Sequence, residues 1–449
     1  MQKAEFEAQV IRGPVTRSSV RTVCLVCSAA SCAQTDPRAP PPSPVLDSVF
    51  ATQFSLANAS YSNQAATRLA GLVRIRSESF DDMKTPPSDP DTDDPRRAGL
   101  VQIRDRHISL VHKHLNLEIV NYYGLVYTWI GSDSSLKPVM VTAHQDTVPV
   151  DTSSLDKWTF PPFEGRIENG YIWAQIVSIM DAVETLRGEI TKHLEAKGYG
   201  NQQIEFILDE GSSVENQYGA SFALLSTGER GYMDIEYSVR TIGGHSSIPP
   251  DHTAIGFLAK IISALEDHPY KPNCQDLNRS PSSMNYVWPI DIVSGGVKVN
   301  ALPEVATAIG NYRIHIDESV KSTEERVLGL MRCCGSFSRT RFYCYLDDSL
   351  EPAPITPTTG KPFQLVAGTI RQAMVRGDEK LFVAPSLPTG NSDTRYFHSL
   401  SKHIFRFTAL RDHDSHNIHT VDEKCKMDDL VQSAGFFFQL LRNVDQDVL

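Results

Sequence analysis

The sequence predicts an α/β fold with a mostly parallel central sheet and a smaller α+β domain inserted into it. Two observations support this prediction. Short apolar strands alternate with helix-period segments across residues 138–208, and this order favours parallel strands packed against helices. Residues 233–331 then follow a strand-helix-strand-strand-helix order, which is typical of a small α+β unit.

The individual elements are predicted from the spacing of their apolar residues. A period of two indicates a strand that is buried on one face, and a period near 3.6 indicates an amphipathic helix. The predicted helices are 99–114, 179–194, 253–265, 322–331 and 428–441. The predicted strands are 116–129 (a pair), 138–143, 204–208, 233–240, 297–302 and 306–316.

Composition excludes several classes of protein. The 449 residues include 43 basic and 54 acidic side chains, which gives a formal net charge of −11. A net acidic chain with no Lys/Arg block argues against nucleic acid as a partner. No apolar run approaches the roughly 18 residues that span a bilayer. The 8 cysteines are scattered and give neither paired zinc-ligand spacing nor a dense disulfide framework.

The first 45 residues read as a leader followed by a Pro-rich linker. Arg17, Arg21 and the short apolar stretch 22–30 resemble a weak signal peptide, and residues 39–44 form an extended spacer. Two N-x-S/T triplets, at Asn58 and Asn278, fit passage through a secretory pathway.

Ionisable side chains follow two of the predicted buried strands. His144 and Asp146 come directly after strand 138–143, and Asp209 follows strand 204–208. Because the carboxyl ends of parallel strands meet at one edge of the sheet, these side chains are expected to lie close together. An imidazole with a nearby carboxylate can be a zinc ligand with its orienting group. The alternative, a lone histidine in a polar loop, remains open from the H-x-D pattern alone.

The block HQDTVPVDTSSLDKWTFPPFEGRIENGYIWA, which begins at His144, resembles the first metal-ligand segment of carboxypeptidase S and its relatives. This family of co-catalytic zinc peptidases also contains aminoacylases and glutamate carboxypeptidases. The resemblance extends from about residue 50 to residue 443, in family order. Its further segments are 207–211, 228–256, 291–304, 388–397 and 417–424.

The resemblance implies a metal site with four named residues. His144 and Asp209 resemble ligands of one zinc ion, and Asp146 resembles the carboxylate that orients His144. His419, in the segment NIHTVDE, resembles the histidine ligand of a second zinc ion. Without the resemblance, His419 would read as an ordinary polar turn residue.

The resemblance also implies a substrate site formed partly by the inserted domain. His245, in GGHSS, resembles the histidine that stabilises the developing oxyanion, often across a dimer interface. Asn300 and Arg313 resemble residues that hold the substrate backbone and its terminal carboxylate, which a guanidinium binds with two hydrogen bonds. Gly390 resembles part of the loop that lines the cleft. Outside this family, His245 would be a turn residue and Arg313 an exposed strand cation.

One stretch of the family pattern is missing, so the chain is identified as internally truncated. After Trp173, family members continue with G-R-G-x-x-D-x-K, whose Asp bridges the metals, and then reach a Glu-Glu pair that supplies the general base and a ligand. Neither motif is present here. The bridging position falls on Ile179, so Asp181 and Glu184 come too late and lie in the helix-patterned part. The sequence therefore predicts weak metal binding and no evident carboxylate to activate water.

The resemblance implies a zinc-dependent metallocarboxypeptidase that releases C-terminal amino acids from short peptides and forms a homodimer. The implied organisation is a leader (1–45), a catalytic domain in two parts (46–231 and 349–449) and a lid/dimerisation domain (232–348). Two alternatives remain. One is an inactive homologue that serves as a dimerisation or peptide-binding module, and the other is an aminoacylase-like amidase that acts on N-acyl amino acids. Fungal relatives are vacuolar, so a vacuolar or secretory location is expected.

Overall fold

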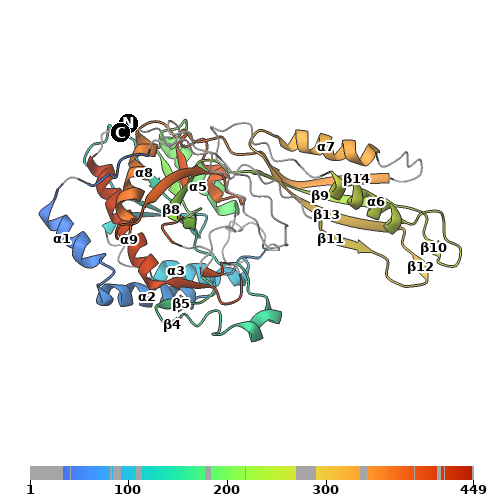
Figure 1. Ribbon diagram of the computed structural model, residues 1–449, viewed down its shortest axis with the longest axis horizontal. Coiled ribbons are helices and arrows are strands. Elements are labelled where there is room, and N and C mark those ends of the chain that lie inside the picture. The colour runs from blue at the N-terminus through green and yellow to red at the C-terminus, as the bar shows by residue number, and fades with distance from the viewer. Residues whose placement is uncertain are drawn as a thin grey trace, which may run out of the picture.

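The protein contains two main sheets in the computed structural model (Figure 1). The residues that the structure describes are 34–40, 42–80, 83, 93–107, 114–176, 184–217, 219–268, 290–333, 341–388, 390–411, 416–418 and 420–446. Among these residues, no helix combines the length and the apolar character that crossing a bilayer requires.

The larger sheet has six strands in the order β15-β8-β16-β6-β3, with β7 paired to β8. It is mixed: β3, β6 and β16 are parallel to one another, as β8 and β15 are, but β16 meets β8 in antiparallel orientation. Its strands are β3 (Met140–Val141), β6 (Ile207–Asp209), β7 (Val214–Gln217), β8 (Ala220–Ser226), β15 (Leu381–Ser386) and β16 (Ile404–Arg406).

Helices cover both faces of this sheet, which explains the continuous apolar sequence of its central strands. On one face, α8 (Lys361–Ala373) and α9 (Met427–Gln446) pack against strand residues such as Leu208 and Phe405. On the other face, Leu194 of α5 (Glu184–Leu194) packs with Ile207 of β6. The result is a three-layer α/β arrangement, which agrees with the predicted α/β class.

Smaller elements surround the larger sheet. A hairpin of β1 and β2 forms a separate two-stranded sheet, and β4, β5 and β17 form a three-stranded one. The strands are β1 (Asn116–Val120), β2 (Gly124–Thr128), β4 (Arg166–Glu168), β5 (Tyr171–Trp173) and β17 (Lys424–Lys426). The helices are α1 (Pro44–Gln53), α2 (Ala59–Val73) and α3 (Ala98–His107). Short helical turns are η2 (Pro95–Arg97), η3 (Thr152–Lys157), η4 (Glu195–Tyr199) and η6 (Asp393–Tyr396).

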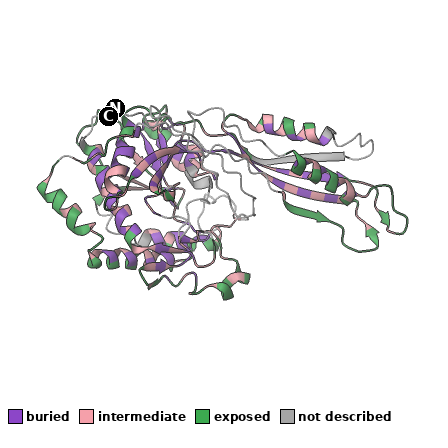
Figure 2. Ribbon diagram, in the orientation of Figure 1, coloured by how far each residue is buried: buried purple, intermediate pink, exposed green. Residues whose placement is uncertain are grey.

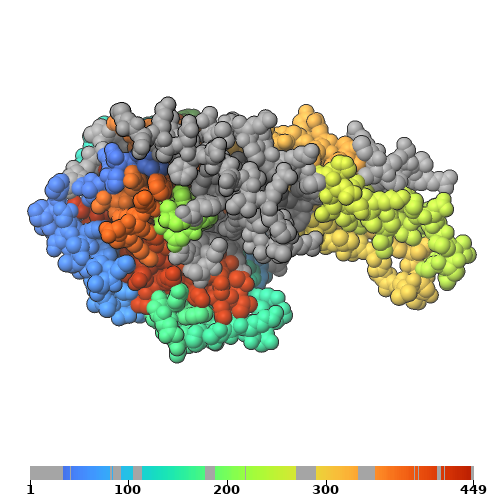
Figure 3. All heavy atoms as spheres, viewed as in Figure 1, coloured from blue at the N-terminus to red at the C-terminus, as the bar shows by residue number. Residues whose placement is uncertain are grey.

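The second main sheet projects from the body as an arm (Figures 1 and 3). Its antiparallel strands have the order β11-β13-β9-β14, and a short pair, β10 with β12, lies at its tip. The strands are β9 (Gly231–Arg240), β10 (Gly244–His245), β11 (Ile290–Gly295), β12 (Ala301–Leu302), β13 (Val305–Ile314) and β14 (Arg341–Leu350). The helices are α6 (Ala254–Asp267) and α7 (Val320–Cys333).

The arm has its own apolar core. Alternate residues of β9 and β13 are buried, because one face of the sheet lies beneath α6 and α7. Leu258 and Ile261 of α6 pack there against Ile235 and Tyr237 of β9. Strand β11, at the edge, is mostly exposed (Figure 2).

The predicted α/β class is confirmed, with three differences in detail. The central sheet is mixed, because the strands β8 and β15 reverse direction relative to β16. The predicted strand 138–143 is reduced to Met140–Val141, and the predicted strand 297–302 to Ala301–Leu302. The Asp181 position lies outside the described residues.

Candidate metal and substrate site

His144 and Asp146 lie just beyond β3, and the structure brings them together. The Nδ1 atom of His144 is 3.1 Å from Oδ1 of Asp146, and each side chain is only 6% exposed. The hydroxyl of Ser79 donates a 2.5 Å hydrogen bond to Oδ2 of the same carboxylate. The carboxylate is thus held from two sides, and it fixes the orientation of the imidazole.

The other ring nitrogen of His144 fits a metal ligand. Nε2 is buried, and no described residue makes a hydrogen bond to it. A buried polar atom without a partner is costly, and a metal ion would relieve that cost. A carboxylate on Nδ1 with an open Nε2 is the usual arrangement of a ligand histidine.

Asp209 ends β6, the strand directly beside β3. The two strands are parallel, with Val141 opposite Leu208, so His144 and Asp209 both lie beyond the carboxyl end of the sheet. Asp209 is buried. In the described part of the chain, no group of three or more His, Cys, Asp or Glu side chains is placed to hold a metal ion. His419, the predicted ligand of the second metal, lies outside the described residues.

His245 belongs to β10 and Asn300 directly precedes β12; these two strands lie at the tip of the arm, away from the body that contains β8 (Figure 1). The backbone N–H of Ser246 donates to the carbonyl of Asn300 at 3.3 Å, and β10 pairs with β12. Nδ1 of His245 is 2.8 Å from the hydroxyl of Ser247. Both predicted residues are exposed. Within one chain, the structure does not bring them to His144.

Arg313 lies at the base of the arm, where β13 meets the body. Its Nη1 donates to Oδ1 of Asn391 at 2.8 Å, and its guanidinium lies over the ring of Tyr232 at 4.9 Å from the centroid. The amide of Asn391 donates in turn to the carbonyl of Arg230. Gly390 is buried next to Asn391. These contacts join the predicted substrate arginine to the predicted substrate loop.

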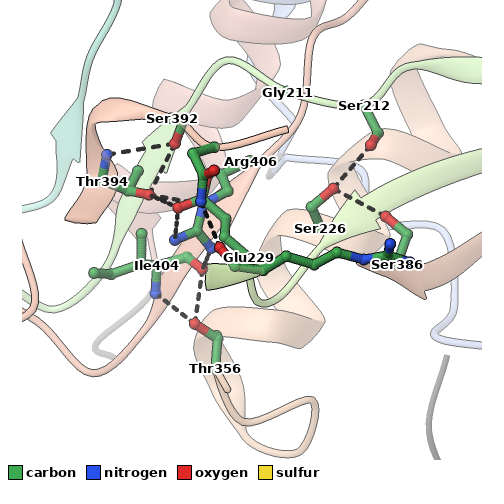
Figure 4. Close-up of polar contacts among 12 residues, drawn as sticks. Gly211, Ser212, Ser226, Glu229, Thr356, Ser386, Ser392, Thr394, Ile404 and Arg406 are labelled. Atoms are coloured by element: carbon green, nitrogen blue, oxygen red, sulfur yellow. Dashed lines mark hydrogen bonds and ion pairs between the residues drawn. The ribbon is translucent and has the colours of Figure 1, made fainter. Parts of the chain in front are cut away.

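Glu229 and Arg406 form a buried ion pair that is absent from the sequence predictions (Figure 4). Arg406 of β16 is opposite Asp209 in the sheet register, and its Nε is 3.2 Å from Oε1 of Glu229. The guanidinium also donates to Thr394 Oγ1 at 2.8 Å, and Thr394 donates to Glu229 at 3.0 Å. The cluster therefore connects the central sheet, the start of the arm and the loop after Gly390.

A row of three serine hydroxyls lies in the same region (Figure 4). Ser212, Ser226 and Ser386 are linked by two contacts of 2.9 Å, and Ser226 is fully buried. The row joins the segment after β6 to β8 and β15. These hydrogen bonds satisfy polar groups that would otherwise be costly to bury.

The sequence contained one signal for the ion pair. Arg406 interrupts the apolar run Ile404-Phe-Arg-Phe407, and Glu229 follows the apolar strand β8 in Gly228-Glu-Arg230. Charged residues are rarely fully buried unless they are paired. An ion pair between Arg406 and Glu229 could therefore have been predicted, although 177 positions separate the two residues.

The charge of Arg406 also acts on a neighbouring histidine. Burial lowers the pKa of His398, and the nearby positive charge of Arg406 lowers it further, while Glu229 opposes the shift. A neutral imidazole is therefore favoured at His398.

Together these features define an α/β body with a histidine and a carboxylate at neighbouring strand ends, and with a separate arm that carries further polar residues. The chain belongs to peptidase family M20/M25/M40, whose model matches residues 140–443. The family assignment confirms the predicted kinship and indicates a peptidase hydrolase.

Two curated relatives illustrate the range of the family. Carboxypeptidase S of Saccharomyces cerevisiae is 29% identical over 493 residues, which cover 86% of this chain and 85% of that protein. Human N-fatty-acyl-amino acid synthase/hydrolase PM20D1 is 28% identical over 408 residues, which cover 74% of this chain and 78% of that protein.

Solved structures share the fold at low identity. Human carnosine dipeptidase 1 aligns with a TM-score of 0.62 and 13% identity, covering 91% of this chain and 100% of that one. A dinuclear metal-binding peptidase of the M20 family from Bacillus subtilis aligns with a TM-score of 0.52 and 13% identity, covering 86% and 98%. These similarities confirm the predicted fold class.

Proposed function

We propose that this chain is a zinc-binding metallocarboxypeptidase that takes short peptides as substrates. The observation that supports the proposal best is the buried pair of His144 and Asp146, in which Nε2 of His144 has no hydrogen-bond partner among the described residues. His144 and Asp209 would hold one zinc ion, and His419 a second. Bound zinc would polarise the scissile carbonyl and lower the pKa of its water ligand.

The roles of the protein's own residues follow from their contacts. Asp146 keeps the proton of His144 on Nδ1, so that Nε2 presents a lone pair, and Ser79 holds Asp146 in place. Arg313, positioned by Asn391, would pair with the terminal carboxylate of a peptide beside Gly390. The proposal includes the division of the chain into a catalytic domain in two parts, 46–231 and 349–449, and a lid/dimerisation domain, 232–348.

The chain lacks two sequence motifs that the proposed catalysis requires. The G-R-G-x-x-D-x-K block and the Glu-Glu pair are missing from the sequence, so the general base and the bridging ligand have no counterpart after Trp173. An inactive peptide-binding member of the family is therefore the second candidate. A third candidate is an amidase for N-acyl amino acids, which the name of the human relative favours.

Zinc content per chain of the purified full-length protein, measured with hydrolysis of dipeptides and N-acyl amino acids, separates these candidates. His144→Ala should lower zinc content, whereas the control His193→Ala should not, because His193 instead contacts Glu118 at 2.9 Å on the surface. Zinc without turnover of either substrate would support the inactive candidate. Preferential cleavage of N-acyl amino acids would support the amidase. Zinc retained in full by His144→Ala would refute the proposed site.

We also propose a homodimer through the arm. Strand β11 pairs with β13 on one edge, and its side chains Ile292 and Val293 are 56% and 60% exposed. An exposed apolar edge strand is a ready surface for pairing with a second copy. In such a dimer, His245 and Asn300 at the arm tip could serve the site of the other subunit. Val293→Lys should convert the dimer to a monomer in light scattering, whereas the control Ile119→Lys on β1 should not.

The vacuole or secretory pathway is the proposed location, on the basis of the resemblance to carboxypeptidase S and of the sequon at Asn58. Glycosidase treatment of the protein purified from its native cells provides the test. A mobility shift that Asn58→Gln abolishes would support the proposal, and unglycosylated protein in the cytosolic fraction would contradict it.

A further inference from the structure

Strands β2 and β3 are each paired on one edge only. In the part of the chain that the structure describes, β2 pairs with β1 alone, and β3 pairs with β6 alone. Among the described strands, the body therefore contains a six-stranded sheet and a two-stranded sheet that both end in an open edge.

A cavity of about 440 Å³ is lined by both of these strands. All of β2 and the segment 138–146 contribute to its wall, so the cavity follows the two strands along their length. Ile190 and Leu194 of α5 also line it, and α5 packs against the β1–β2 hairpin. Its volume lies in the usual range of about 300–1,000 Å³ for ligand pockets. We call this cavity the strand slot.

The strands are bridged at one end of the slot by a side chain instead of a ladder. Nε2 of Gln145 donates to the backbone carbonyl of Tyr123 at 3.2 Å. This contact places the start of β2 beside the segment that follows β3. No residue of β2 pairs with a residue of β3 in the described sheets.

The main chain of β3 has groups that point into the slot. The N–H groups of Met140 and Thr142 donate to the carbonyls of Phe206 and Leu208 at 3.0 Å. Because successive residues of a strand direct their polar groups to opposite edges, the N–H and C=O of Val141 face the slot. The side chain of Val141 is 46% exposed, as expected for an edge strand that lines a cavity.

The chemistry of the lining decides which occupant fits. Most side chains around the slot are aliphatic or aromatic, and the imidazole of His144 and the carboxylate of Asp146 lie together at one end. A neutral, aliphatic ligand is therefore favoured over a charged one. An acyl chain would fill the apolar volume, but it could not form strand hydrogen bonds with the main-chain N–H and C=O of Val141. An extended polypeptide satisfies both requirements.

We propose that the strand slot is a vacant strand position that accepts an extended aliphatic polypeptide segment from another chain. The added strand pairs with β3 on one side and β2 on the other, and it joins the two sheets into one continuous sheet. This proposal does not depend on the proposed enzymatic function, because no metal ligand takes part in the pairing.

The test uses the full-length protein and two synthetic nine-residue peptides. The first is acetylated and amidated, alternates valine with threonine, and has a lysine at each end. The second has proline in place of its central valine, which removes a main-chain donor and disfavours the extended pairing. Binding is followed by anisotropy of labelled peptide, and the binding site by amide hydrogen exchange.

We expect saturable binding of the first peptide and at least tenfold weaker binding of the second. At a concentration about ten times its Kd, the first peptide should slow amide exchange in 124–128 and 138–142 about tenfold. Val141→Lys, at a partly exposed position in the slot, should abolish this effect. Ile119→Lys, on the far strand of the hairpin, should preserve it.

Four outcomes would overturn the proposal. These are an absence of saturable binding, equal binding of both peptides, protection confined to the arm, and slower exchange around the slot with octanoate but not with the peptide. Equal binding would mean that main-chain pairing is not involved. Protection of residues 290–295 alone would locate strand addition at β11, and an octanoate effect would identify an acyl-chain site.

Discussion

Replacing Glu229 with glutamine should destabilise the protein by about 3–5 kcal/mol, because the substitution leaves the Arg406 charge buried without a counter-ion. The side chains of Glu229 and Arg406 are 2% and 1% exposed, so water cannot replace the lost partner. Glutamine can still accept the hydrogen bond from the Thr394 hydroxyl, so the substitution removes the negative charge and keeps this hydrogen bond. The shape of the side chain is almost unchanged, so packing contributes little to the expected loss.

A surface ion pair provides the matched control for this prediction. Arg166 and Glu168 are 2.9 Å apart but 49% and 38% exposed, so Glu168→Gln should cost less than about 1 kcal/mol. The double variant Glu229→Leu with Arg406→Met should recover much of the stability lost in Glu229→Gln, because it removes both charges.

Urea denaturation followed by circular dichroism measures these changes as free energies of unfolding. The slope of the free energy against urea concentration should be the same for all variants. The reasoning would be refuted if Glu229→Gln cost no more than Glu168→Gln. It would also be refuted if the double variant were as unstable as the sum of its single substitutions.

Three further predictions concern the C-terminal segment. Burial, together with the negative charges of Asp429 and Glu423, raises the pKa of the Cys425 thiol to about 12. This thiol should therefore react with a reagent such as DTNB only after the protein unfolds, and rapid reaction of the native protein would contradict the prediction. Phe436→Ala should cost about 3–5 kcal/mol, because this ring is fully buried, whereas Leu441→Ala, at a position 43% exposed, should cost much less in the same urea titration. Burial alone would raise the pKa of Asp429, but hydrogen bonds with His416 and Arg376 outweigh burial and lower this pKa. The carboxylate therefore stabilises the folded state fully above about pH 4, and this stabilisation is lost as the pH falls through the folded-state pKa. The stability difference between the wild type and Asp429→Asn should therefore shrink on acidification, and a difference that grows would contradict the sign of the shift.

Local patterns allowed the prediction of elements whose apolar residues repeat regularly. Strand β9 and helix α6 were predicted within two residues of their observed bounds, because alternate burial and a helical apolar face both leave a clear period. Strands β7, β8 and β15 were not predicted. Strand β15 pairs with β8, which is distant in sequence, and a local pattern does not reveal such a pairing.

The candidate site was predictable where the residues follow strands in sequence. His144, Asp146 and Asp209 were predicted from the ends of two apolar strands, and the structure places them beyond two adjacent parallel strands. Their roles as metal ligands remain predictions. The contact between Arg313 and Asn391 could not be predicted, because it joins two sheets through residues 78 positions apart.

The sequence by itself determined the α/β class and the family pattern, and it predicts that a segment of this pattern is missing after Trp173. These properties depend on the order and period of residues, which are local. Only the tertiary structure decided that Arg406 and Glu229 form a buried pair and that β2 and β3 line a shared cavity with open edges. Both features depend on which surfaces meet after folding. Contacts between residues far apart in the sequence therefore decided the ion pair and the cavity, which the local sequence pattern could not predict.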